Sequence, residues 1–505
     1  MRLKLFFLLV CFGILVGCRP AAQPVVEPTS PAVVGLPIAT TTPVERDVTA
    51  SVPTLTPFPA ETPTFVPSRT HTPVATPLPS FGEASIGDPY TPELGNTGYD
   101  VQHYTLKFGL NPGATTIDAV AELELMSTLP NLVVFSLDFV GFEITSLTVN
   151  GVPTDFTREG EKLNVSLANG FGIGERFVVS VTYSGTPTIQ ASPYVPFLRS
   201  LGLQILGSSM FVVAQPDGAR YWFPANDHPL DKATFRFELT VPTGMTGVAT
   251  GVLVETRIAE DANTFVWVMD DPMATYLASV AVGEYERIDD ISPGGIPIRH
   301  YVFPDLRQPF LDAADVTGEA LDWMAEMFGP YPYDSFGFVT TRIIRAALET
   351  QTMVVLSELM LNEQTVVHEI VHMWFGNWVS MASWADMWNN EGFAVYFSLM
   401  WQYRDDPVYF NDYMAYHTNN VAANDNGDPM GNLPASRLFG YSSYQKGAAF
   451  IHAIRLEVGD DAFFNGLRVY LDTYGGGTAT RDDFQRVMEE TSGVDLDELF
   501  AEWLE

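Results

Sequence analysis

Two histidines four residues apart, with a glutamate beside the first, are the feature of this sequence most suited to chemistry. They occur in the largely apolar stretch 366–375 as His368-Glu369-x-x-His372. On a helix the two imidazoles lie on one face, with Cβ atoms roughly 5–6 Å apart. They can then bind one metal ion, at about 2.0–2.1 Å per nitrogen for zinc. Glu369 can reach a water at that metal without being a ligand.

Two histidines do not complete a catalytic zinc site, which usually has three protein ligands and one open position. Glu391, within the segment 388–396, follows His372 after eighteen residues, which is room for a loop and the start of a second helix. A structural zinc is a poor alternative because such sites favour four closed ligands, mostly Cys. The sequence therefore predicts one catalytic zinc per chain, held by His368, His372 and Glu391.

The elements around this site change character along the chain. From residue 88 to about 286, apolar residues alternate with polar ones, as in Phe235, Phe237 and Leu239, which predicts half-buried antiparallel strands. Asn150-Gly151 predicts a hairpin turn. From residue 309 to 328 the spacing is helical, and Gly329-Pro330 predicts its end. Further helices are expected at about 443–458, 460–474, 480–492 and 495–504.

Composition bounds the class of protein. The 505 residues leave room for two or three domains, and 46% hydrophobic residues is typical of a globular chain. The formal net charge of −35 argues against nucleic acid as a partner, because its phosphates need Lys and Arg. The two cysteines, Cys11 and Cys18, both lie in the N-terminal segment, so no disulfide or thiol nucleophile is expected in the folded part.

The first residues read as a targeting segment. A short basic start precedes the apolar run 5–16, which is too short to span a bilayer but suits a signal peptide. Leu15-Val16-Gly17-Cys18 resembles the bacterial lipoprotein processing site, which implies lipidation at Cys18 and an extracytoplasmic, membrane-anchored protein. An ordinary secretory signal with an incidental Cys is the alternative. Residues 19 to about 85, rich in Pro and Thr, are expected to form a disordered tether.

Several segments, in order, resemble the aminopeptidase N family of thermolysin-like zinc metallopeptidases, in a short two-domain bacterial lipoprotein form. Residues 94–101 look like its opening strand, and 215–220 with 223–229 look like its Ala-Arg…Pro-x-x-Asp-x-Pro segment. Residues 346–350 occupy the place of its Gly-x-Met-Glu-Asn exopeptidase motif, and 444–448 resemble its catalytic-tyrosine segment. The matches run from about residue 88 to the end of the chain.

The resemblance implies an α+β protein, in which an N-terminal all-β saddle-like domain (86–287) precedes a thermolysin-like, mainly helical catalytic domain (288–505). It implies a zinc-dependent aminopeptidase that acts on peptides with a free N-terminus. Glu369 would be the general base and Tyr444 the oxyanion donor, with Tyr441 as a rival for that role. Glu349, assisted by Gln215, would bind the substrate's α-ammonium.

Departures from the family pattern leave alternatives open. The family often has Glu at the position of Gln215, and Thr350 replaces the Asn of the exopeptidase motif. A zinc endopeptidase with weakened amine recognition is therefore one alternative, and a non-catalytic peptide-binding lipoprotein is another. The chain ends soon after the last expected helix, so we expect an open cleft without the helical C-terminal domain of longer relatives.

Overall fold

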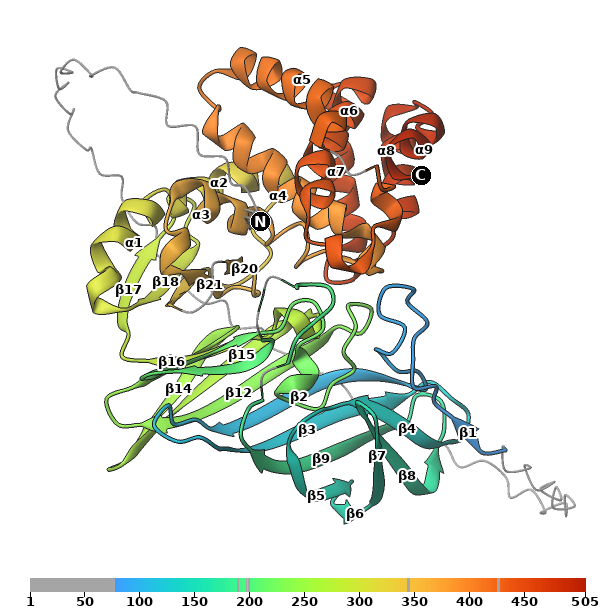
Figure 1. The fold of residues 1–505 in the computed structure, drawn as a ribbon, viewed down its shortest axis with the longest axis vertical. Coiled ribbons are helices and arrows are strands. Elements are labelled where there is room, and N and C mark those ends of the chain that lie inside the picture. Colours follow the sequence, from blue (N-terminus) through green and yellow to red (C-terminus); the bar gives the residue numbers. More distant parts are fainter. Residues whose placement is uncertain (1–77, 189, 197, 199, 343–345, 425–426) are drawn as a thin grey trace, which may run out of the picture. The chain divides into compact units, whose positions relative to one another are not determined.

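The computed structural model describes residues 78–188, 190–196, 198, 200–342, 346–424 and 427–505, and from Pro77 to Glu505 the chain forms one compact unit. The predicted signal segment, Cys18 and most of the predicted tether lie outside the described residues. Figure 1 shows the strands of the first part, in blue to green, gathered apart from helices α4–α9, in orange to red.

The main sheet of the N-terminal region has eight described strands. In spatial order these are β14 (Val252–Ile258), β15 (Ala262–Met273), β12 (Ala233–Pro242), β2 (Tyr99–Gly109), β3 (Ile117–Ser127), β9 (Arg176–Gly185), β5 (Glu143–Val149) and β6 (Val152–Pro153). The predicted alternation is confirmed, since Phe235, Phe237 and Leu239 are fully buried while their neighbours along β12 are not. The hairpin at Asn150-Gly151 is also confirmed: both residues have positive φ, and Val149 pairs with Val152.

The predicted antiparallel pairing is found between all neighbouring strands of this sheet except one pair. Strand β12 pairs parallel with β2, with Phe235 opposite Tyr104. Parallel neighbours need a long crossover rather than a tight turn. The chain between β2 and β12 supplies that crossover, and it includes some of the strands of two smaller sheets.

Those smaller sheets complete the β region. One has the order β1 (Ser80–Phe81), β4 (Leu132–Asp138), β8 (Lys162–Phe171), β7 (Asp155–Glu159). The other has the order β10 (Gly202–Leu206), β11 (Ser209–Val213), β16 (Val280–Gly283), β13 (Thr246–Ala249). Strand β11 ends two residues before Gln215, one of the predicted site residues.

The C-terminal region begins with a mixed sheet and continues as helices. The sheet has the order β17 (Glu286–Ile291), β18 (Pro297–Val302), β19 (Phe338–Thr341), β21 (Val354–Ser357), β20 (Ala347–Leu348), and a small pair joins β22 (Ser380–Met381) to β23 (Thr478–Ala479). The helices are α1 (Arg307–Ala314), α2 (Thr317–Phe328), α3 (Glu363–Val371), α4 (Met387–Gln402), α5 (Pro407–Asn424), α6 (Gly447–Val458), α7 (Asp460–Tyr474), α8 (Arg481–Ser492) and α9 (Asp497–Leu504). The predicted fold class, a β region followed by a mainly helical region, is confirmed.

Two helix predictions need adjustment. The helical pattern at 309–328 is divided between α1 and α2, although α2 ends at Phe328 just before Gly329, as expected. The helix expected from residue 443 begins as a π-helical turn, Ser442–Lys446, before α6.

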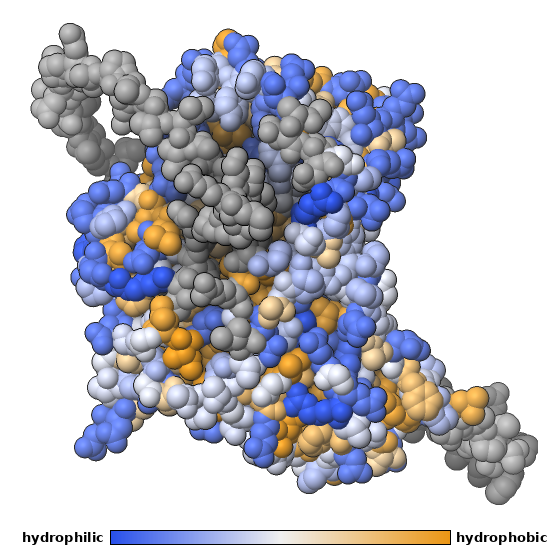
Figure 2. Space-filling model, viewed as in Figure 1, coloured by the Kyte–Doolittle hydropathy of each residue, from blue (hydrophilic) through white to orange (hydrophobic). Residues whose placement is uncertain are grey.

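The hydropathy of the surface differs between the helical part and the strands. In Figure 2 hydrophilic residues dominate the helical part at the top, while hydrophilic and hydrophobic residues are mixed over the strands below. Within the described ranges no helix is both long enough and apolar enough to cross a membrane.

Candidate metal centre and active site

Helix α3 presents the two predicted histidines. Its N-terminus is capped by Asn362, whose side chain accepts a hydrogen bond from the backbone N–H of Thr365 at 2.9 Å. His368 lies within the helix. His372 directly follows the last helical residue and keeps a right-handed helical backbone (φ −58°, ψ −23°). The four-residue spacing therefore brings both imidazoles to one face.

Helix α4 supplies the third predicted ligand. Every residue from Met387 to Leu399 is buried, as expected for a helix that is packed on all sides. Gly392, next to Glu391, allows a close approach: a Cβ there would lie only 2.8 Å from the backbone carbon of Gly447. This contact brings the start of α6, and the π-helical turn before it, against the part of α4 that carries Glu391.

The three predicted ligands meet with distances that suit zinc. Oε2 of Glu391 lies 3.2 Å from Nε2 of His368 and 3.5 Å from Nε2 of His372, and the two Nε2 atoms are 3.3 Å apart. Ligand bonds of about 2.0–2.1 Å in a tetrahedral arrangement require ligand atoms roughly 3.3–3.4 Å apart. The donor atoms are therefore already spaced as three corners of one zinc tetrahedron.

Charges and hydrogen bonds around the ligands favour a bound cation. The Nδ1 of His372 lies 3.1 Å from the carbonyl oxygen of Phe375, which assigns the proton to Nδ1 and leaves Nε2 free as a ligand. Burial lowers the pKa of His372, but the carboxylates of Glu391, Glu349 and Glu369 outweigh it and raise the value to about 10. A site that attracts a proton this strongly suits a divalent cation.

Glu369 has the environment expected of a general base. Its side chain is buried, and its Oε2 has no hydrogen-bond partner within the described part of the chain. Burial raises the pKa of Glu369 well above its usual range; His372 opposes that shift, and Glu349 and Glu391 add to it. A carboxylate with a raised pKa accepts a proton more readily than one in water.

Tyr444 lies in the π-helical turn and faces the same centre. Its ring is parallel to that of His368, with centroids 6.2 Å apart and an interplanar angle of 3°. Burial raises the pKa of Tyr444 well above its usual range, and the nearby Glu391 and Glu349 add to this. The hydroxyl therefore keeps its proton and can donate a hydrogen bond.

The predicted amine anchor lies beside the metal ligands. Glu349 follows β20 and is buried, and its carboxylate lies within 4.8 Å of ligand atoms of both Glu369 and His372. Nε2 of Gln215 donates a hydrogen bond to Oε1 of Glu349, which joins the end of β11 to the end of β20. The structure thus brings all of the sequence-predicted site residues except Cys18, which lies outside the described residues, to one place.

Two further residues form hydrogen bonds beside the site and were not predicted from the sequence. The side chain of Asn377 donates to the backbone carbonyl of Glu349 at 2.7 Å, and the hydroxyl of Tyr276 donates to the carbonyl of Gly376 at 3.3 Å. Asn377 closely follows the His-Glu-x-x-His helix, so a search of the turn after that helix could have found it. Tyr276 comes from the β region and carries no sequence signal.

Three other histidines form contacts away from the metal ligands. His228 pairs with Asp88 at 3.3 Å, His452 lies 3.2 Å from the hydroxyl of Tyr396, and Nε2 of His417 lies 3.0 Å from the carbonyl oxygen of Gln445.

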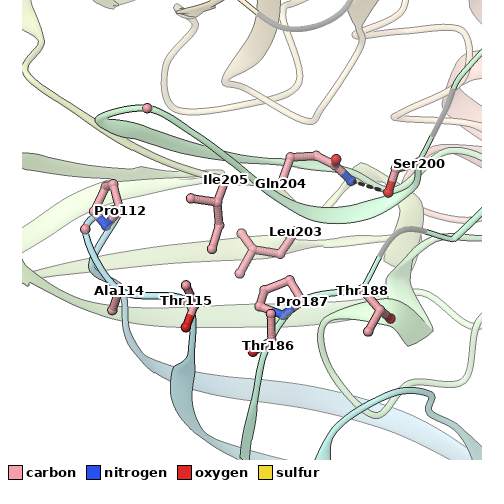
Figure 3. Close-up of a pocket in the computed structure, with 12 residues that line it drawn as sticks. Pro112, Ala114, Thr115, Thr186, Pro187, Thr188, Ser200, Leu203, Gln204 and Ile205 are labelled. Carbon is pink, nitrogen blue, oxygen red and sulfur yellow. Dashed lines mark hydrogen bonds between the residues drawn. The ribbon is translucent and has the colours of Figure 1, made fainter.

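A cavity of about 450 Å³ lies elsewhere, in the β region, between the loop 112–115, the segment 186–188 and strand β10 (Figure 3). Its described lining contains prolines, threonines, small residues and aliphatic side chains but no titratable group. The described lining of this cavity therefore offers no acid, base or metal ligand.

Comparison with protein families agrees with this arrangement. The model of the "Peptidase M1 N-terminal domain" matches residues 100–277, and that of the "Peptidase family M1 domain" matches residues 313–503. The chain belongs to peptidase family M1.

Curated relatives match part of their own length. Aminopeptidase A of Gloydius brevicauda is 28% identical over 59% of this chain and 34% of that protein. Probable aminopeptidase 2 of Sulfurisphaera tokodaii is 25% identical over 73% of this chain and 49% of its own length. The chain thus spans about a third to a half of the length of these relatives.

Solved structures of related proteins are matched over nearly their whole length. An M1 zinc metallopeptidase from Deinococcus radiodurans is 28% identical, with a TM-score of 0.76, over 83% of this chain and 97% of that chain. A variant of the Deinococcus radiodurans M1 zinc metallopeptidase bound to the peptide Tyr-Ser-Ala matches with a TM-score of 0.77, 28% identity and the same coverage. A two-domain M1 zinc metallopeptidase variant bound to L-tryptophan has a TM-score of 0.78 at 28% identity, over 83% of this chain and 98% of that chain.

Proposed function

We propose that this protein is a zinc-dependent aminopeptidase that removes N-terminal residues from peptides. The observation that carries the proposal is the spacing of 3.2, 3.3 and 3.5 Å among the donor atoms of His368, His372 and Glu391, beside the buried carboxylate of Glu349. The first feature suits a catalytic zinc and the second suits an α-ammonium. Peptide substrates are further supported by the related structure that holds Tyr-Ser-Ala.

Each residue around the metal centre has a separate role in hydrolysis. When bound, zinc supplies Lewis acidity, which lowers the pKa of water to about 7 and polarises a carbonyl group. Glu369 takes the proton of the attacking water and passes it to the leaving amine. The hydroxyl of Tyr444 donates a hydrogen bond to the carbonyl oxygen of the substrate as negative charge develops there.

Glu349 determines which bond is cut. Its carboxylate forms a charge-assisted hydrogen bond with the free α-ammonium of the substrate and so places the first peptide bond at the reactive centre. Gln215 contributes an amide that is already hydrogen-bonded to Glu349. An amide oxygen can accept a hydrogen bond from the ammonium, but it adds no negative charge.

A comparison of matched peptides tests the proposal. A free peptide and its N-acetylated form are each incubated with the zinc-loaded protein, and the products are identified by mass spectrometry. We expect stepwise loss of N-terminal residues from the free peptide only, and no cleavage after treatment with a chelator until zinc is restored. If the protein cleaves none of a broad set of free peptides, the proposal is refuted and a peptide-binding role is favoured.

A zinc endopeptidase is the second candidate, and the Gln215–Glu349 contact favours it. The amide donor already occupies one oxygen of the carboxylate that would bind the α-ammonium. If this weakens amine recognition, an internal bond should be cut equally well in the free and the acetylated peptide.

We also propose that the protein is anchored outside the cytoplasm by a lipid on Cys18. The support is the sequence Leu15-Val16-Gly17-Cys18 after a short apolar run. Expression in a bacterial host should place the protein in the membrane fraction, and Cys18→Ser should release it from that fraction. A wild-type protein that is recovered unlipidated in the soluble fraction would contradict the proposal.

A further inference from the structure

The turn that follows helix α3 connects both halves of the proposed active site. The backbone N–H of Asn377 donates to the carbonyl of His372 at 3.0 Å, and the side chain of Asn377 donates to the carbonyl of Glu349 at 2.7 Å. His372 also contacts this turn through the carbonyl of Phe375. A displacement of the turn 375–378 would therefore move a metal ligand and the amine anchor together.

A lysine of the β region binds this turn. Lys232 directly precedes β12, is partly buried, and lies far from residues 377 and 477 in the sequence. Its Nζ donates to the carbonyl oxygens of Asn377 at 2.8 Å, Trp378 at 3.2 Å and Gly477 at 3.1 Å. An ammonium has three N–H donors and no acceptor, so three carbonyls match its full donor set.

The partners of this ammonium are unusual because all three are backbone groups. A lysine that loses water normally gains a carboxylate partner, and burial here lowers the pKa of Lys232 to about 7, against a rise from Asp271. The three carbonyls stabilise the charged form, in which all three can be hydrogen-bonded. Removal of the ammonium would leave these carbonyls without that donor.

A second contact supports the same link between the two regions. The hydroxyl of Tyr276, in the short turn Thr275–Leu277 of the β region, donates to the carbonyl of Gly376, which also accepts a hydrogen bond from the hydroxyl of Ser380 at 2.7 Å. Three consecutive carbonyls of the turn, at residues 376, 377 and 378, are thus held by side chains of Tyr276 and Lys232.

We infer that Lys232 is a positioning residue, which holds the turn 375–378 by its carbonyls at residues 377 and 378 and thereby sets both the metal ligand His372 and the amine anchor Glu349. The inference rests on the proposed function for the identity of the metal and of the amine. It assigns to the β region a direct part in maintaining the catalytic centre, through backbone carbonyls rather than through contact with substrate.

The test measures zinc release apart from catalysis. Zinc-loaded wild type, Lys232→Met and Lys232→Arg are mixed with a chromogenic chelator, and the rate of zinc release is followed by absorbance. We expect Lys232→Met, which keeps the length of the side chain but loses the donors, to release zinc about 10-fold faster, at the lower end of the effect of losing an outer-shell partner. Lys232→Arg, which keeps donors and charge, should restore most of the wild-type rate.

Lys162 provides the matched control. Its ammonium also donates to three oxygens, those of Gly95, Asn96 and Asp138, but all of these belong to the β region. Lys162→Met should lower the unfolding temperature without changing zinc release. Equal release rates for Lys232→Met and Lys162→Met would overturn the inference.

A second variant and a second measurement separate positioning from general damage. Tyr276→Phe removes a single hydroxyl from the same turn and should accelerate zinc release in the same direction, so the inference can be tested even if Lys232→Met does not fold. In Lys232→Met the KM for free peptides should also rise, because Glu349 is displaced. If wild type binds zinc but cuts no peptide, the proposed function fails while the release rates still test Lys232.

Discussion

Glu369 shows how the environment of a single residue defines its role. The side chain type alone would suit an exposed carboxylate, but here it is buried, and one of its oxygens has no partner among the described residues. A buried carboxylate with a free oxygen needs a ligand or water to complete its hydrogen bonds. The position next to His368 makes the attacking water the natural partner.

Glu369→Gln should remove turnover and keep the metal. The amide preserves the shape of the side chain but cannot accept the proton, so kcat should fall by about 10²–10⁴-fold, the usual contribution of a general base. Kinetics on a free dipeptide substrate and metal analysis of the same sample measure the two effects. Loss of zinc from the variant would show instead that Glu369 supports the ligands.

The π-helical turn before α6 is the element that carries Tyr444. Such turns insert an extra residue into a helix and occur frequently at functional sites. Here the turn 442–446 is held from outside by His417 on α5, whose Nε2 lies 3.0 Å from the carbonyl of Gln445. Since a carbonyl oxygen can only accept a hydrogen bond, the imidazole of His417 must carry a proton on Nε2.

His417→Ala should lower kcat by about 5-fold, as for the loss of one hydrogen bond of about 1 kcal/mol, without changing zinc content. In the Tyr444→Phe background, which has already lost the proposed oxyanion donor, His417→Ala should have no further effect. His417→Gln, which keeps a donor, should recover part of the activity. Additive effects of the two substitutions would contradict a role for His417 through Tyr444.

Strand β18, which pairs with β19, contains a buried histidine that stays neutral in the folded protein. Nδ1 of the buried His300 accepts a hydrogen bond from the backbone N–H of Phe338 at 3.1 Å. Burial, with a smaller effect of Arg299, lowers the pKa of His300 to about 3. Between that value and the pKa of about 6.5 in an unfolded chain, the unfolded state binds one more proton.

The free energy of unfolding should therefore decrease as the pH falls below 6.5, and His300 should contribute about 1.4 kcal/mol per pH unit. His300→Asn, which offers a neutral acceptor, should reduce the slope of the unfolding free energy against pH by the equivalent of about one proton. Urea unfolding of the metal-free proteins between pH 5 and 7 measures the difference, in which the other histidines cancel. Parallel curves for the two proteins would contradict the prediction.

At the scale of the whole molecule the dominant feature is its charge. The formal net charge is −35, and the face in Figure 2 is largely hydrophilic over the helical region. A field of this sign attracts cationic peptides and repels anionic ones, at a range that salt controls.

Salt should therefore distinguish substrates by charge. Between about 0.01 and 0.1 M salt the Debye length shrinks from about 30 to 10 Å, so kcat/KM for a lysine-rich peptide should fall. A neutral peptide of the same length and first residue is the control and should change little. An equal salt response of both peptides would show that the bulk charge does not steer substrates.

Sequence patterns could predict the features that depend on local geometry. The spacing of His368 and His372 follows from the helical repeat, and the turn at Asn150-Gly151 follows from the backbone preferences of two residues. The break between α1 and α2 and the π-helical turn were not predicted, because both interrupt an otherwise helical spacing.

Short-range spacing and ordered motifs in the sequence were enough to predict the three metal ligands, the general base and the class of fold, and the class of fold is confirmed. Three features became visible in the folded protein alone: the parallel pairing of β2 with β12, the contact of Gln215 with Glu349, and the hydrogen bonds of Lys232 to the turn after α3. Each of these joins residues more than a hundred positions apart. Such contacts arise from the packing of complete elements against one another, which no local pattern specifies.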